Sequence, residues 1–71
     1  MMHLGKATHQ AKRLASSRFE AMDVVHCGGG YYVTKRHELS RNGLINKKAV
    51  RRTVKPAGSV IENHNFDRYA V

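Results

Sequence analysis

The chain is short of residues on which several classes of protein depend. Its 71 residues include one cysteine, one proline and no tryptophan. A single cysteine, Cys27, cannot form an internal disulfide, and the sequence starts with no apolar run of signal-peptide length, so a reducing cytoplasm is the expected compartment. No stretch approaches the roughly 18 consecutive apolar residues of a membrane helix, so we expect no membrane-spanning segment.

The side chains that catalysis and metal binding require are also scarce. Structural zinc sites need ligands paired at short spacings, and one cysteine with scattered histidines lacks that pattern. His26 and Cys27 are neighbours in a stretch expected to be extended, where adjacent side chains point to opposite faces and cannot act together. We therefore expect no enzyme activity, no metal, no cofactor and no small-molecule substrate. The histidines are His3, His9, His26, His37 and His64.

What the sequence has in excess is positive charge, and most of it lies in one segment. The formal net charge is +8. Between Lys35 and Lys55, eight basic residues face the single acid Glu38, a net of +7, whereas the rest of the chain has five basic and four acidic residues. Charge concentrated in this way attracts polyanions or acidic protein surfaces. The predicted binding residues are Lys35, Arg36, Arg41, Lys47, Lys48, Arg51, Arg52 and Lys55.

The apolar pattern predicts a small α+β domain that spans residues 1–71, with flexible ends at 1–7 and 63–71. A first helix is expected to begin at Thr8 as N-cap and to run to Arg18. The β-branched and aromatic segments around three glycines predict one antiparallel β-hairpin with a three-residue loop, and which face of its first strand is buried stays open. Phe66 and Tyr69 are the candidate anchors of the C-terminal tail.

Two more short helices are expected in the basic segment. Thr34 is a suitable N-cap for a helix over 35–41. In 46–55 the apolar residues recur at helical spacing opposite the basic ones, which favours a helix over a strand and places its end before Pro56. A turn at 56–59 and a short edge strand at 59–62 complete the expected fold. The expected core is Leu14, Phe19, Val24 or Val25, Val33, Leu39, Leu44, Ile45, Val50 and Val54.

The basic segment has three possible targets: nucleic acid, an acidic protein surface and an anionic membrane. A membrane is disfavoured, because the apolar side of 46–55 has only small side chains. The two helices expected around Gly43 resemble a helix-turn-helix, although the segment offers phosphate-binding residues rather than base-reading ones. For a protein target, Tyr31 and Tyr32 lie on opposite strand faces, so one of them can pack inside while the other is presented to a partner.

The stretch MDVVHCGGGYYVTKRHEL, followed by the basic segment, resembles small bacteriophage transcription regulators that bind the host RNA polymerase, such as that of a Xanthomonas phage. The resemblance implies docking on the polymerase β′ subunit, inhibition of initiation through the σ factor, and antitermination. It implies no individual contact residues.

Three functional hypotheses follow from these observations. The first is a non-enzymatic regulator that binds bacterial RNA polymerase, with its basic segment facing nucleic acid. The alternative is a sequence-tolerant DNA- or RNA-binding protein that acts without polymerase, through a helix-turn-helix-like segment. A third is an inhibitor that occupies a nucleic-acid-binding complex of the host.

Overall fold

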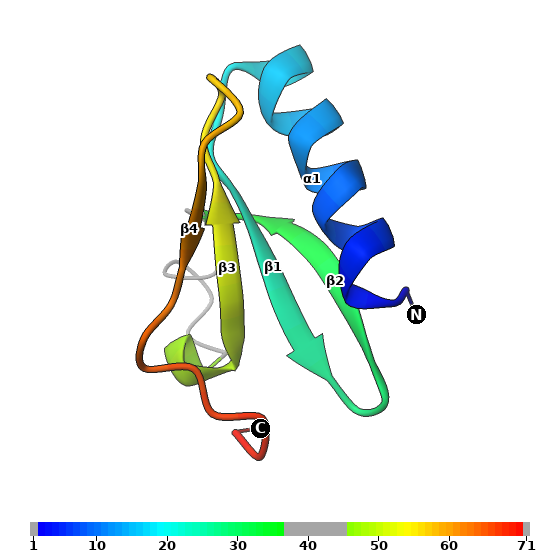
Figure 1. Ribbon diagram of the computed structural model, residues 1–71, viewed down its shortest axis with the longest axis vertical. Helices are drawn as coiled ribbons and strands as arrows, with labels where there is room; N and C mark the ends of the chain where they lie inside the picture. The colour runs from blue at the N-terminus through cyan, green and yellow to red at the C-terminus, as the bar shows by residue number, and fades with distance from the viewer. Residues whose placement is uncertain (1, 37–45, 71) are drawn as a thin grey trace.

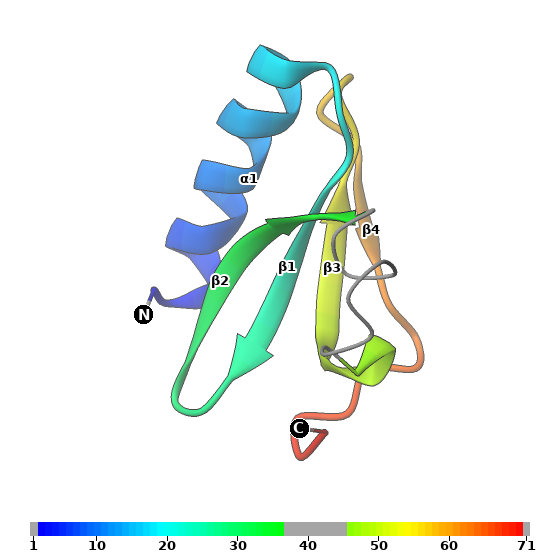
Figure 2. The same cartoon turned by 180° about the vertical axis from the view of Figure 1, so that it is seen from behind.

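The computed structural model describes residues 2–36 and 46–70, which form one helix packed on a four-stranded antiparallel sheet (Figure 1). This arrangement confirms the predicted α+β class. The strand order is β2-β1-β3-β4, so β1 is central, and Figure 2 shows the opposite face of the sheet with α1 behind it. In chain order the elements are α1 (Leu4–Arg18), β1 (Met22–Cys27), β2 (Gly30–Lys35), the 3-10 turn η1 (Lys47–Ala49), β3 (Val50–Val54) and β4 (Val60–Glu62).

The helix α1 begins four residues before the predicted N-cap. His3 takes the N-cap position without a side-chain hydrogen bond, which explains why no capping signal marks this start. Thr8 lies inside the helix instead, where its hydroxyl donates to the Leu4 carbonyl at 2.8 Å. After Arg18 the chain turns through Phe19, which adopts a left-handed conformation (φ 55°) and is 84% exposed. The prediction that Phe19 belongs to the core is therefore wrong.

The predicted hairpin is confirmed, but its loop has two residues rather than three. Cys27 pairs with Gly30 across the two strands, which leaves only Gly28 and Gly29 in the turn. Gly28 has a φ of 59°, and a positive φ at the first turn position is the pattern of a type II′ hairpin. The turn therefore favours glycine at position 28, because other residues rarely adopt a positive φ.

The segment 46–55 is not the predicted helix: after the short turn η1 it forms the strand β3. A register shift opposite Val24 and Val25 inserts Arg51 as an extra residue, because Val24 pairs with Arg52 while Val25 pairs with Val50. Such a bulge reverses the alternation of side chains, so two valines four residues apart point to opposite faces. The bulged strand therefore explains the spacing of the apolar residues, which in the sequence is typical of a helix.

The other predicted helix of the basic segment is not capped by Thr34, since β2 extends to Lys35, but the chain is helical at Arg36, one residue after the predicted start. The remainder of that prediction, including Leu39, Leu44 and Ile45, lies outside the described residues. Because a strand replaces the second helix, the helix-turn-helix interpretation is wrong as well.

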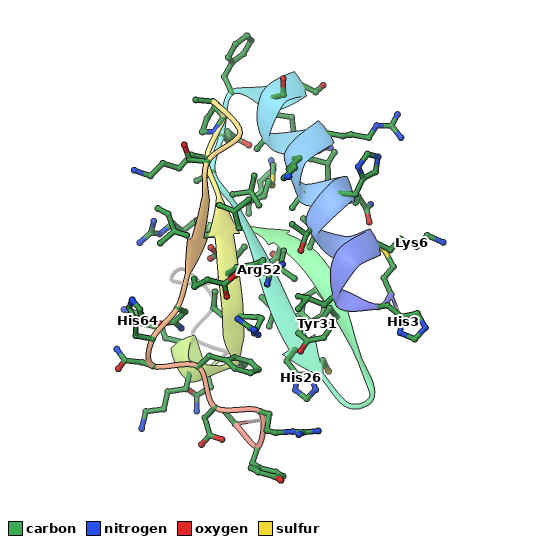
Figure 3. The ribbon with its side chains drawn as sticks, viewed as in Figure 1. His3, Lys6, His26, Tyr31, Arg52 and His64 are labelled. Atoms are coloured by element: carbon green, nitrogen blue, oxygen red, sulfur yellow. The ribbon has the colours of Figure 1, made fainter. Side chains whose placement is uncertain are left out.

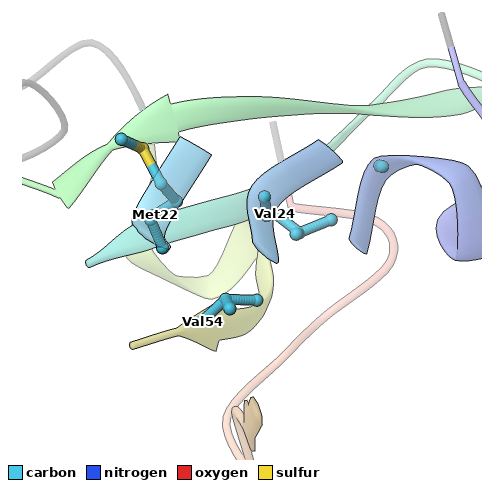
Figure 4. Packing of buried hydrophobic residues seen from close by; sticks show 6 residues of the cluster. Met22, Val24 and Val54 are labelled. Carbon is cyan, nitrogen blue, oxygen red and sulfur yellow. The ribbon is translucent and has the colours of Figure 1, made fainter. Parts of the chain in front are cut away.

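Two apolar clusters lie on the two faces of the sheet. Between α1 and the sheet, Met22, Val24 and Val54 pack against the alanines of the helix, which are fully buried (Figure 4). On the other face Val25 and Val50 pack with Ala49. Both faces of β1 are therefore buried. Leu14 and Val33, which were expected in the core, are only partly buried at the edge of the helix-side cluster. The helix alanines are Ala7, Ala11 and Ala15.

The turn after Pro56 and the edge strand β4 are confirmed, and hydrogen bonds hold the tail. The backbone of Lys55 bonds to Ser59 and Gly58, which closes the β3–β4 hairpin. Further on, the Asn63 amide donates to the Val50 carbonyl at 2.8 Å, and the Asp67 N–H donates to the carbonyl of Lys48 at 2.8 Å.

The two aromatic residues expected to anchor the tail differ. Phe66 is partly buried, whereas Tyr69 is 80% exposed. No helix within residues 2–36 and 46–70 has the length and apolar composition needed to cross a bilayer.

Candidate nucleic-acid interface

Folding divides the predicted basic residues between two ends of the sheet. Lys35 and Val54 both pair with Met22, so Lys35, Arg36 and Lys55 lie at the end where β1 begins. Lys47 and Lys48, in η1, lie at the opposite end. The length of β3, about 13 Å, separates the backbone of Lys47 and Lys48 from that of Lys55. Arg41 lies outside the described residues. The side chains of Arg36 and Lys47 nevertheless line one hollow on the face of the sheet away from α1.

Arg51 and Arg52 are held by a single acid on the neighbouring strand. The bulge places both guanidinium groups beside Glu62, with Arg52 Nη2 at 2.8 Å from one carboxylate oxygen and Arg51 bonded to the other. Arg52 also donates from Nη1 to the Thr8 hydroxyl at 3.1 Å, so it joins β3 to both β4 and α1 (Figure 3). Its side chain is only 19% exposed. We infer that Arg52 stabilises the fold rather than meeting a partner.

The other acids of the described residues are engaged too. Glu20 lies 4.0 Å from the Lys35 ammonium. The Asp67 carboxylate accepts a hydrogen bond from the Tyr69 N–H at 2.9 Å. Asp23 is 2% exposed and accepts a hydrogen bond from the Thr53 hydroxyl at 2.6 Å. Of the acids in the described parts, Asp67 is the exposed one without an ion pair, and it lies in the C-terminal tail, away from α1 in the sequence.

The pKa of the buried Asp23 carboxyl is shifted by its surroundings. Burial raises its pKa above the ordinary value, against the lowering effects of the Thr53 hydrogen bond and the Arg36 charge. It faces a hollow on the side of the sheet away from α1. Among the described residues no three His, Cys, Asp or Glu side chains lie together as metal ligands would. The hollow is lined by Asp23, Arg36, Lys47, Val50, Thr53, Ile61, Glu62 and Asn63.

The helix α1, by contrast, carries basic residues with no acid among them. Lys6, Lys12, Arg13 and Arg18 form no ion pair within the described residues. Lys6 and Arg13 fall seven residues apart on one stripe, and Figure 3 shows Lys6 pointing outward from the helix. This stripe lines a surface groove, here called the α1 groove. Its lining residues are Met2, Lys6, His9, Gln10, Arg13, Leu14 and Ser17.

Sequence reasoning missed the α1 groove because it summed charge over too wide a range. Outside the basic segment the five cations nearly balance the four acids, but all four acids lie beyond the helix. A window of fifteen residues from Leu4 to Arg18 without any Asp or Glu was the available signal.

The tyrosine pair lies on opposite faces, as the alternation of the strand predicts. Tyr31 packs at the rim of the helix-side cluster, and Tyr32 packs against the Val25 cluster on the other face. Both are partly buried, and burial raises the pKa of the Tyr32 hydroxyl, with a smaller contribution from Cys27.

No protein-family model matches the chain, and comparisons with curated proteins and with solved structures find no match either.

Proposed function

We propose that this protein is a non-enzymatic, sequence-tolerant nucleic-acid-binding protein that contacts the phosphate backbone through the α1 groove. One observation carries the proposal: the acids of the described residues are paired, hydrogen-bonded or buried, while the cations of α1 have no ionic partner. Unopposed cations along a groove attract a polyanion and release its counterions on binding.

The composition of the groove favours nucleic acid over an acidic protein. Protein hot spots are built around large aromatic or apolar anchors. The large apolar side chains that are well exposed in the described residues lie elsewhere, namely Phe19, Val60, Ile61 and Tyr69. The groove offers spaced cations and the amide of Gln10, which suit phosphate and sugar oxygens and carry little sequence information.

The test is the salt dependence of binding to a labelled 20-nucleotide strand, measured by fluorescence anisotropy. For the double variant Lys6→Gln/Arg13→Gln, the log–log salt slope is expected to fall by about 1.4 on a single strand, or about 1.8 on a duplex. Strands of unrelated sequence should bind with equal affinity.

A matched control makes the same change of charge on the same helix, outside the groove. The double variant Lys12→Gln/Arg18→Gln should change the slope by clearly less. Equal losses from both pairs would mean that the groove has no special part, and no binding at low salt would end the proposal.

The setting predicted from the phage-regulator resemblance is a complex with RNA polymerase in the cytoplasm of a bacterial host. It is tested by a tagged pull-down from bacterial lysate, with and without nuclease. Polymerase subunits that stay bound after nuclease would establish the protein contact. Their loss with the nucleic acid would leave phosphate binding as the whole function.

A further inference from the structure

Three aromatic rings meet on the helix-side face of the sheet, near the hairpin turn. His26 of β1 and Tyr31 of β2 are cross-strand partners, and their ring centroids lie 5.1 Å apart at an interplanar angle of 62°. Phe66, from the tail, approaches the other side of His26 at 6.1 Å and 87°. All three are partly exposed, and Figure 3 shows His26 and Tyr31 side by side. We call these three residues the ring row.

Cations surround one end of the ring row. The Arg51 guanidinium lies 5.3 Å from the centroid of the Phe66 ring. The exposed Lys47 and Lys48 are nearby, because the tail next to Phe66 is bonded to the backbone of η1. Two acids lie near this end: Glu62 is already bound by two arginines, and Asp67, next to Phe66, accepts the Tyr69 N–H.

Partly exposed rings beside exposed lysines match the chemistry of an unpaired nucleotide. Every base has a π-face that stacks on an aromatic side chain, while its phosphate meets a neighbouring cation. In a duplex the base faces are stacked on one another, so such rings recognise single strands. The α1 groove lacks aromatic side chains other than His9 and suits the phosphates alone.

We propose that the ring row is a base-stacking site for single-stranded RNA or DNA, with phosphate contacts from Lys47 and Lys48. This inference rests on the proposed nucleic-acid binding and narrows it to unpaired strands. Arg51 lies over the Phe66 ring, and His26 contacts both Tyr31 and Phe66 edge to face. The whole molecule is only 30 Å in its longest dimension, so an oligonucleotide of about eight residues is long enough to reach both this site and the α1 groove.

The experiment compares two labelled strands of eight units in the same buffer, one carrying bases and one in which every unit is abasic. DNA and RNA forms of the base-carrying strand are measured in parallel. Wild-type protein is expected to bind the base-carrying strand about tenfold tighter, the effect of one or two stacked bases. Phe66→Leu should remove most of that difference and leave the affinity for the abasic strand unchanged.

Phe19→Leu is the matched control, since Phe19 is a more exposed aromatic residue at the opposite end of β1 and should not affect either strand. If wild type binds both strands equally, base stacking is overturned while phosphate binding stands. If it binds neither, both proposals fail.

A second measurement uses the wild-type protein, so it does not require any variant to fold. In the NMR spectrum of the wild-type protein, the ring protons of Tyr31 and Phe66 should shift upfield on addition of the base-carrying strand and stay in place with the abasic one. Unchanged ring shifts at saturation would overturn the stacking site.

Discussion

The cations of α1 and those of β3 differ in what surrounds them. In β3, Arg51 and Arg52 stand out in the sequence, yet both are bound by Glu62 and one is mostly buried. In α1, Lys6 and Arg13 are spread through an ordinary-looking helix, yet no acid of the described residues opposes them. Density of charge along the chain is thus a poor guide to charge available at the surface.

The difference arises from the register of the sheet. Antiparallel pairing sets Glu62 opposite Arg52, and cross-strand neighbours of opposite charge attract. In α1 the positions three and four residues from each cation hold no acid, and the inward face is given to alanine. If this account is right, changes in β3 alter stability and changes in α1 alter binding.

The largest effect is expected at Arg52. Replacing Arg52 by Gln removes charge-assisted bonds to Glu62 and Thr8 at a mostly buried site, so the free energy of unfolding should fall by about 2 to 3 kcal/mol. Arg13→Gln, which makes the same change on the exposed face of α1, should cost less than about 0.5 kcal/mol. Urea denaturation measures both, and equal losses would remove the distinction between the two regions.

A smaller effect is expected when the acid itself is neutralised. Glu62→Gln makes β3 resemble α1, because it leaves two arginines without an ionic partner. Stability should fall by about 1 kcal/mol, reduced by the solvent exposure of the carboxylate, while nucleic-acid affinity should rise. The control is Glu20→Gln, whose longer pair with Lys35 should matter less to stability. If Glu62→Gln binds nucleic acid no more tightly than the wild type, the two freed arginines do not contact the nucleic acid.

The buried acid gives a pH-dependent effect of definite sign. Because the pKa of Asp23 is raised in the folded protein, the folded state holds this proton to higher pH than the unfolded state does. The contribution of Asp23 to stability is therefore full below the unfolded pKa of about 3.9 and is lost as the pH rises through the folded pKa. Urea denaturation between pH 4 and 7 should show that the free energy of unfolding of Asp23→Asn no longer falls in this way as the pH rises. Asp67→Asn, which alters an exposed carboxylate, should retain the fall.

The smallest effect is expected at Cys27, an exposed free thiol beside the hairpin turn. Cys27→Ser should change the free energy of unfolding by less than about 0.5 kcal/mol and leave nucleic-acid binding intact. A complete loss of binding with the fold preserved, as judged by circular dichroism, would give the thiol a function.

Local chemistry explains which parts of the fold were predictable. Glycines mark the β1–β2 turn, and Pro56 with Gly58 marks the next one, so both hairpin positions follow from the sequence. The start of α1 was missed because His3 supplies no side-chain cap. The strand β3 was mistaken for a helix because a bulge, which depends on pairing with β1, places its valines four residues apart on opposite faces.

The candidate site was less predictable, because it depends on which charges meet. The sequence names Arg51, Arg52 and Glu62 but not the register that brings them together. The ring row likewise joins β1, β2 and the tail, and its members are up to forty residues apart. The absence of acids from α1 is the one feature of this site that the sequence alone could have predicted.

The central claim is that α1, and not β3, meets the nucleic acid. The most direct test compares the salt slopes of single-strand binding for Arg13→Gln and Arg52→Gln, which change the net charge equally, at a temperature where both variants are folded. The account predicts that Arg13→Gln lowers the slope by about 0.7 and that Arg52→Gln leaves it unchanged. A loss of slope confined to Arg52→Gln would contradict it and place the phosphate contacts on β3.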